Sequence, residues 1–231
     1  MKIQEKTKSL IKTILLFTLF FTIRAIPILL FKIDVNTFTN MDTVVYSLLC
    51  DFTFLFIIGL CYYKTLKKDF KPFFKNFSKN IETSLKYYLV GLAVMIVSNI
   101  LINVLFKNGI STNEDTVRTY IQTSPFLMFL SISIYAPFAE ELLFRKSIRE
   151  VINNKWLYIL ASGLIFGYLH IMSTPGLIKF LYLIPYSSLG IAFAYTYYKT
   201  NNIYQTIVMH QIHNTITLIL LLIGMNIWRS L

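Results

Sequence analysis

Charged residues are scarce in this sequence: Asp, Glu, Lys and Arg make up 14% of its 231 residues, whereas soluble domains carry roughly 25%. Hydrophobic residues reach 55%, and the mean hydropathy is +0.60. A soluble core of this chain length could not bury so much apolar surface. The composition therefore excludes a soluble globular domain and predicts an integral membrane protein.

Cysteine is also scarce, and the two cysteines give no disulfide framework. Cys50 and Cys61 fall in one apolar run, about three helical turns apart, which is too far for a bridge. No cleavable signal peptide is expected, because the first apolar run is long and no small-residue cleavage site follows it. Internal repeats, low-complexity linkers and soluble domains are absent as well, so we expect one membrane domain over residues 1–231.

Apolar runs of about 20 residues, the length that crosses a bilayer, recur seven times. We predict an all-α polytopic bundle of about seven transmembrane helices, with six or eight as alternatives, since the segment Lys64–Glu82 could form a surface helix. The expected spans are Ile11–Phe31, Thr43–Tyr63, Ser84–Phe106, Pro125–Phe144, Trp156–Ile171, Leu177–Tyr198 and Ile203–Trp228.

Acidic residues are half as numerous as basic ones, 11 against 22, which gives a net charge of +11. The basic residues concentrate in every second loop, as the positive-inside rule requires for cytoplasmic segments. We therefore attribute the charge to contact with the lipid bilayer and expect no nucleic-acid partner. The N-terminus is predicted to be cytoplasmic and the C-terminus external, in a multi-pass protein of a bacterial cell membrane.

Histidine occurs three times, and His170, His210 and His213 all lie in apolar runs. Ionisable residues inside membrane spans are functional-site candidates by default. The same runs contain the adjacent pair Glu140 and Glu141 and the amide of Asn214, together with Arg24 and Asp51, which form either a buried pair or the lining of a wet crevice.

Helical spacing relates these residues to one another. Glu141 and Arg145 stand four apart, acid first, which favours an ion pair, while Glu140 is turned about 100° away and is free for another role. Counting about 1.5 Å per residue from the cytoplasmic boundary places Glu140, His210, Asn214 and His170 at depths of about 13, 10, 16 and 21 Å. Tilted helices can bring these depths together. The alternative is that such residues only fix the register between helices.

Three motifs occur in order: EELLFR (Glu140–Arg145), FGYLH (Phe166–His170) and HQIHN (His210–Asn214). They resemble the EExxxR, FxxxH and HxxxN motifs of the CAAX prenyl protease and bacteriocin-processing enzymes, also called the Abi family, and they lie within residues 125–220. The resemblance implies an intramembrane endopeptidase with Glu140, His170, His210 and Asn214 as catalytic residues. Glu141, Arg145 and Phe166 would be supporting residues, and the extra His213 has no place in the family pattern.

Peptide hydrolysis needs an activated water, a stabilised oxyanion and a proton for the leaving amine. Glu140 with His170 could activate the water, and His210 with Asn214 could donate to the oxyanion. The motifs contain no Ser or Cys, which argues against a covalent nucleophile. A divalent metal such as zinc on Glu140, His170 and His210 is the alternative arrangement, although no HExxH motif occurs. The sequence leaves both open.

The expected substrate is a membrane-associated peptide or protein, such as a bacteriocin precursor, a signalling peptide or a CAAX-like protein. Two other functions use the same buried polar residues: a non-catalytic bacteriocin-immunity binder and a small transporter. The retained Glu140 favours the enzyme, because a binder would not need it. The oligomeric state cannot be predicted from these residues.

Overall fold

All regular secondary structure in the computed structural model, which describes residues 2–106 and 111–229, is helical. The first half of the chain comprises α1 (Lys2–Thr22), α2 (Ala25–Phe31), η1 (Val35–Thr37), α3 (Asn40–Cys61), α4 (Tyr63–Lys75) and α5 (Phe77–Phe106). The second half comprises α6 (Thr112–Thr123), α7 (Pro125–Phe129), η2 (Leu130–Tyr135), α8 (Ala136–Glu140), η3 (Glu141–Ser147), α9 (Ile148–Val151), α10 (Lys155–Ile171), α11 (Lys179–Thr200) and α12 (Ile203–Arg229).

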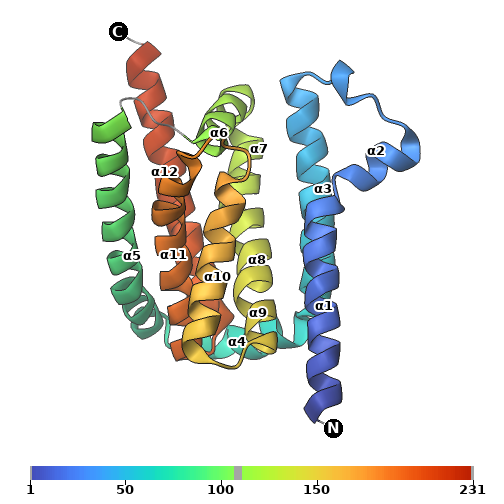
Figure 1. Cartoon of the computed structure of the whole chain (residues 1–231), viewed down its shortest axis with the longest axis vertical. Helices are drawn as coiled ribbons and strands as arrows, with labels where there is room; N and C mark the ends of the chain where they lie inside the picture. Colours follow the sequence, from blue (N-terminus) through green and yellow to red (C-terminus); the bar gives the residue numbers. More distant parts are fainter. Residues whose placement is uncertain (1, 107–110, 230–231) are drawn as a thin grey trace.

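The predicted all-α membrane bundle is confirmed, whereas the number of spans needs qualification. Four helices of the described chain are long and apolar enough to cross a membrane, and a fifth if α1 and α2 form one span. The predicted spans Trp156–Ile171 and Leu177–Tyr198 correspond to α10 and α11. Both run lengthwise in the bundle, between α5 and α8 in the view of Figure 1, but α10 has only 17 residues and α11 is not among the helices that are both long and apolar enough to cross a membrane.

The predicted first span, Ile11–Phe31, is broken rather than continuous. The axes of its two parts, α1 and α2, differ by 63°. Pro27 lies in the first turn of α2, and its ring disfavours a helical carbonyl four residues earlier, at Ile23. The chain bends there, which frees Arg24 at the junction to reach Asp51 on α3.

The helix that carries the two glutamates contains two π-helical segments, which helical periodicity alone did not predict. It runs continuously over Pro125–Val151 as α7, η2, α8, η3 and α9. Pro137 has no N–H to donate to the carbonyl of Ser133, and the helix is widened to the π form in η2 just before it. A second π segment, η3, contains Glu141 and Arg145. Such widenings re-aim side chains and frequently occur at functional sites.

Helices α10 and α11 pack in very close contact because glycine occupies the interface. A Cβ atom on Gly167 would lie 2.1 Å from Ser187 Oγ and 2.8 Å from its backbone nitrogen. At Gly163 a Cβ atom would lie 2.4 Å from the side chain of Ile191. Small residues allow helix backbones to approach closely in membranes. This contact fixes the part of α10 that lies just before His170.

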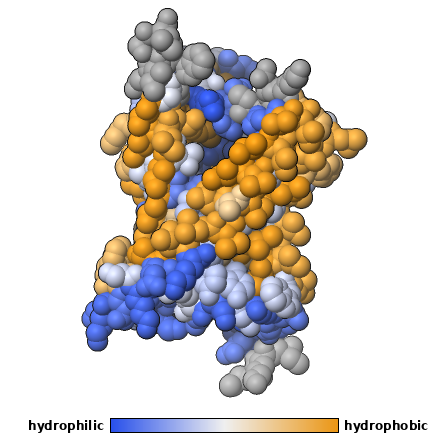
Figure 2. All heavy atoms as spheres, turned by 90° about the vertical axis from the view of Figure 1, so that its left-hand side faces the viewer, coloured by the Kyte–Doolittle hydropathy of each residue, from blue (hydrophilic) through white to orange (hydrophobic). Residues whose placement is uncertain are grey.

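The surface has the pattern expected of a bilayer protein. Apolar side chains cover most of the face shown in Figure 2, and hydrophilic side chains form a band across its lower end. Helix α4 lies across that end of the bundle, where α1 begins, and α12 ends at the opposite end (Figure 1). The face in Figure 2 is also hollowed between apolar ridges, with hydrophilic side chains inside the hollow.

Candidate active site

The predicted ion pair between Glu141 and Arg145 forms in the centre of the bundle. Arg145 Nε lies 3.0 Å from Glu141 Oε2, its Nη2 lies 3.3 Å from Oε1, and both side chains have no exposed surface. Arg145 Nη1 donates to Ser162 Oγ at 3.0 Å, and the guanidinium carbon lies 4.7 Å from the centre of the Phe166 ring. The Arg145 guanidinium, paired with a carboxylate and hydrogen-bonded to Ser162, thus joins η3 to α10.

His210 contacts both glutamates, a bridging position that the spacing did not indicate. Its Nδ1 lies 3.0 Å from Glu141 Oε1, and its Nε2 lies 3.9 Å from Glu140 Oε2. Because the Glu141 carboxylate is held by Arg145 and only accepts hydrogen bonds, Nδ1 of His210 carries the proton. Phe193 stacks on the same imidazole with ring centres 5.2 Å apart. His210 is therefore fixed in orientation, with Nε2 directed to Glu140.

Glu140 has a different environment from its neighbour. Its side chain is about 12% exposed, it lines the large pocket, and its Oε2 atom has no hydrogen-bond partner among the described residues. A buried carboxylate oxygen without a partner is costly unless a water or ligand satisfies it. The geometry thus agrees with the roles predicted for the two acids: the Glu141 carboxylate is held by hydrogen bonds, whereas Glu140 Oε2 is free to bind a water or a substrate.

His170 is held by the residue one turn before it in its own motif. Its Nδ1 lies 2.9 Å from the carbonyl oxygen of Phe166, and the two rings are 4.6 Å apart. A carbonyl accepts, so Nδ1 is the donor and Nε2 of the neutral ring retains its lone pair. This contact gives Phe166 a concrete supporting role: its carbonyl selects the tautomer of His170, and its ring lies against both His170 and Arg145.

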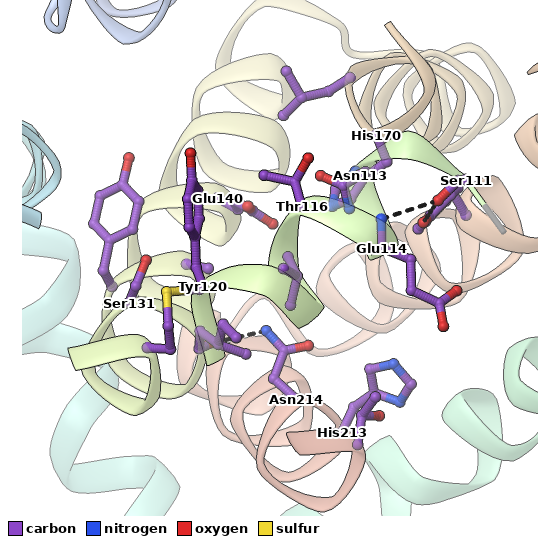
Figure 3. A pocket seen from close by; sticks show the side chains of 18 of the residues that line it. Ser111, Asn113, Glu114, Thr116, Tyr120, Ser131, Glu140, His170, His213 and Asn214 are labelled. Carbon is purple, nitrogen blue, oxygen red and sulfur yellow. Dashed lines mark hydrogen bonds between the residues drawn. The ribbon is translucent and has the colours of Figure 1, made fainter. Parts of the chain in front are cut away.

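Asn214 approaches the same pocket from α12, one turn after His210. Its Nδ2 donates to the backbone carbonyl of Ile132 at 2.8 Å, in the π segment η2. That bond orients the amide and leaves its second N–H unused by this partner. Figure 3 shows Glu140, His170 and Asn214 projecting from three different helices around one pocket.

The pocket that these residues line has a volume of about 1200 Å³, at or above the upper end of the range for ligand pockets. Polar residues of α6, including Asn113, Glu114 and Thr116, form one of its walls (Figure 3). Asn99 and Asn103, four residues apart on α5, also line it. The catalytic candidates therefore lie in a large, partly polar cavity within an otherwise apolar bundle.

The remaining polar candidates also lie at this pocket. Arg24 Nη2 bonds both carboxylate oxygens of Asp51, at 2.8 and 3.1 Å, and both residues line the cavity. Only Asp51 is buried, since the Arg24 side chain is 56% exposed, so the pair lines the crevice and is not a buried ion pair. His213 faces α5, where its Nδ1 lies 3.0 Å from the hydroxyl of Tyr88. It flanks the pocket away from Glu141 and Arg145.

Tyr186 is a site residue that sequence reasoning missed. Its ring stacks on His170 with centres 4.9 Å apart and planes 24° from parallel. Its hydroxyl lies 2.8 Å from Ser111 Oγ, and Ser111 also caps the N-terminus of α6. Tyr186 could have been predicted only from its position on the face of α11 that lines the pocket, and that face cannot be identified without knowing how the helices pack.

The described residues contain no group of three His, Cys, Asp or Glu side chains placed to hold one metal ion. His210 Nδ1 bonds Glu141, and His170 Nδ1 faces a carbonyl, so each imidazole has only its Nε2 available. An imidazole held through Nδ1 with Nε2 free is also how metal-bound histidines are held, so a zinc ion on Glu140, His170 and His210 stays a prediction, although the three side chains are not gathered around one point in the described structure.

Comparison with known proteins finds a family match in the part of the chain that carries the motifs. Residues 122–216 match the family described as "Type II CAAX prenyl endopeptidase Rce1-like". This segment begins at the end of α6 and contains all three motifs, from Glu140 to Asn214. This match covers 95 of the 231 residues, and over them the chain is similar to the CAAX protease family. The resemblance seen in the motifs is thereby confirmed, and the family is one of membrane endopeptidases.

Two curated relatives of this chain are bacterial. The chain is 25% identical over 188 residues to the UPF0177 protein YvdC of Lactococcus lactis subsp. lactis (strain IL1403), which covers 80% of this chain and 69% of YvdC. It is 31% identical over 113 residues to YdiL of Bacillus subtilis (strain 168), whose name describes a candidate membrane peptidase. That alignment covers 48% of this chain and 43% of YdiL. No solved structure matches the chain at a significant level.

Proposed function

We propose that the chain is an intramembrane endopeptidase that hydrolyses a membrane-associated peptide or protein with a water molecule activated by Glu140. The observation that carries the proposal is the buried, unpartnered Oε2 atom of Glu140, 3.9 Å from His210 Nε2. A separation beyond direct hydrogen-bond range suits a bridging water. The family match and the similarity to YdiL support the reaction class.

In this mechanism Glu140 takes a proton from the water as the general base. The second hydrogen of the water is donated to the Nε2 lone pair of either His210 or His170, which orients the water, because each Nδ1 is already committed to another acceptor. In this proposal His210 does not donate to the oxyanion, as the sequence had suggested, because its one N–H is at Nδ1. The water oxygen then attacks the carbonyl carbon of the scissile peptide bond. Positioned general-base catalysis contributes about 10²–10⁴ in rate.

The resulting oxyanion needs a donor in a site of low dielectric constant. The second N–H of Asn214 is the proposed donor, preoriented by the bond that the first makes to Ile132. Fixed donors of this kind are worth about 10²–10³ in rate. When the C–N bond breaks, protonated Glu140 returns its proton to the leaving amine, which restores the carboxylate.

Glu141 and Arg145 have positioning roles in this proposal. Arg145 holds the Glu141 carboxylate, which in turn orients His210 with its Nε2 toward Glu140. Lysine could not replace Arg145, because the bidentate contact with Glu141 and the bond to Ser162 both need the planar guanidinium group.

The substrate class follows from where the site lies. A pocket of about 1200 Å³ inside a membrane bundle suits an extended segment of a peptide that is itself held at the bilayer. We propose a bacterial membrane peptide, such as a bacteriocin precursor or a signalling peptide, since the two relatives are bacterial.

The test uses purified protein in lipid nanodiscs that also contain a pool of synthetic membrane-anchored peptides. Cleavage products are identified by mass spectrometry, for wild type and Glu140→Gln, with and without a chelator and beside metal analysis of the protein. The proposal predicts products from wild type only, at a rate that the chelator leaves unchanged. Binding of peptides without products would make the protein a binder, and loss of activity with the chelator would replace the metal-free mechanism.

A further inference from the structure

Helix α4 has a basic face that no other part of the described chain neutralises. Its sequence, YKTLKKDFKPFFK, has lysines at 64, 67, 68, 71 and 75, which recur with helical period, and all five side chains are exposed. None of the ion pairs among the described residues includes a lysine of α4. The single acid of the helix, Asp69, is buried.

Phenyl rings lie beside this basic face. Phe70, Phe74 and Phe77 are each nearly half exposed. Their rings contact one another, with centres 4.6 Å apart for Phe70 and Phe74 and 6.1 Å apart for Phe74 and Phe77. Exposed aromatic rings next to lysines are typical of helices that lie in the plane of the membrane interface.

The third face of α4 attaches it to the start of α12. Asp69 accepts from the backbone nitrogen of Ile203 at 2.9 Å through its carboxylate, and its carbonyl accepts from Asn202. Buried Phe73 packs on Tyr204 with ring centres 6.1 Å apart. His210 follows two turns later on α12, so α4 supports the base of the helix that carries two site residues.

The position of α4 decides which anion its basic face would meet. It crosses the end of the bundle (Figure 1), in the region where the hydrophilic band adjoins the apolar surface (Figure 2). An acidic protein or a nucleic acid would bind lysines alone and would leave the neighbouring phenyl rings in water. A phospholipid offers a phosphate to the lysines and acyl chains to the rings.

We propose that α4 is a docking surface for anionic phospholipids of the adjacent leaflet, with their phosphates on the five lysines and their acyl chains against Phe70, Phe74 and Phe77. Lipid bound there presses α4 onto the start of α12 and so stabilises the bundle. This surface is independent of the proposed peptidase activity, and its test needs no substrate.

The experiment measures which lipids the detergent-solubilised full chain retains by native mass spectrometry, from an equimolar mixture of phosphatidylglycerol and phosphatidylcholine. Each lysine at an anionic surface contributes about fivefold in affinity. We expect wild type to retain phosphatidylglycerol in at least tenfold excess. The variant K64Q/K67Q/K71Q/K75Q, which keeps Lys68, should lose most of this excess and retain at most about a fivefold preference, with unchanged helical content by circular dichroism.

A control variant, K6Q/K8Q/K179Q/K199Q, removes the same charge from other helices and should keep the preference. Phosphatidylglycerol should also raise the melting temperature of wild type and the control, but not of the α4 variant. Equal retention of both lipids by wild type, or equal loss in the two variants, would overturn the proposal. Displacement of the lipid by glycerol 3-phosphate would instead identify a site for soluble anions and would also refute it.

Discussion

Among the described residues, two Glu–Arg pairs have the same i,i+4 spacing in opposite environments, and they give a matched test of the buried pair. Glu141–Arg145 has no exposed surface, whereas the side chains of Glu114 and Arg118 are 40% and 39% exposed. Replacing each arginine by methionine removes the charge and keeps most of the apolar stem. The substitutions R145M and R118M therefore differ mainly in the burial of the carboxylate left behind.

The structure sets the expected magnitudes. R145M deletes both bonds to Glu141 and both bonds to Ser162, and it leaves the buried Glu141 carboxylate with its hydrogen bond from His210 but without its cation. Breaking a buried pair in this way costs about 3–5 kcal/mol, or about two to nearly four orders of magnitude in the folding equilibrium. R118M breaks an exposed pair, for which about 0.5 kcal/mol or less is expected.

The free energy of unfolding would be measured in mixed micelles by titration with a denaturing detergent and circular dichroism. The double variant E141Q/R145M should regain much of the stability lost in R145M, because it leaves no buried charge unpaired. Similar losses for R145M and R118M would mean that the central pair is solvated, and that it cannot hold His210 as inferred.

Three further predictions follow from other contacts. Gly167→Ala should lower the melting temperature markedly, because the added Cβ atom would clash with the backbone of Ser187. The control Gly59→Ala should leave the melting temperature unchanged, because no atom lies within 4 Å of the added Cβ atom. Equal effects of the two substitutions would refute the close packing of α10 on α11. Tyr186→Leu should lower kcat by removing the ring that stacks on His170, and Tyr186→Phe should retain it; if both match wild type, Tyr186 does not position His170. A reporter fused within 64–82 should be cytoplasmic and one fused after Arg229 external, and the reverse orientation would overturn the predicted topology.

Much of the site could be predicted because helical spacing determines which side chains of one helix share a face. The pairing of Glu141 with Arg145 and the contact of Phe166 with His170 are both i,i+4 relations within single motifs. The scarcity of charge likewise marked Glu140, His170 and His210 as exceptional inside apolar runs. Both properties depend on one helix alone, so they can be predicted even when the positions of the other helices are unknown.

Relations between helices could not be predicted in the same way. The contact of His210 with Glu141 depends on the rotation of α12 relative to η3, and the π form of η3 changes that rotation by an amount that periodicity does not encode. The break at Arg24 and the stacking of Tyr186 depend on partners far away in the sequence. The count of four or five long apolar helices is lower than the predicted number of spans for a related reason, because α10 is too short and α11 is not among the helices that are long and apolar enough to cross a membrane.

The most direct measurement compares Glu140→Gln with Glu141→Gln, two neighbouring substitutions of identical chemistry, for peptide cleavage and melting temperature. Glutamine at 140 keeps the shape of the side chain but cannot take the proton of the water. The account predicts that Glu140→Gln lowers cleavage by about 10²–10⁴ or more with a melting temperature near wild type. Glu141→Gln should lower the melting temperature at least as clearly as the turnover, because Arg145 and His210 lose their common partner. Wild-type cleavage by the Glu140→Gln protein would contradict the central claim.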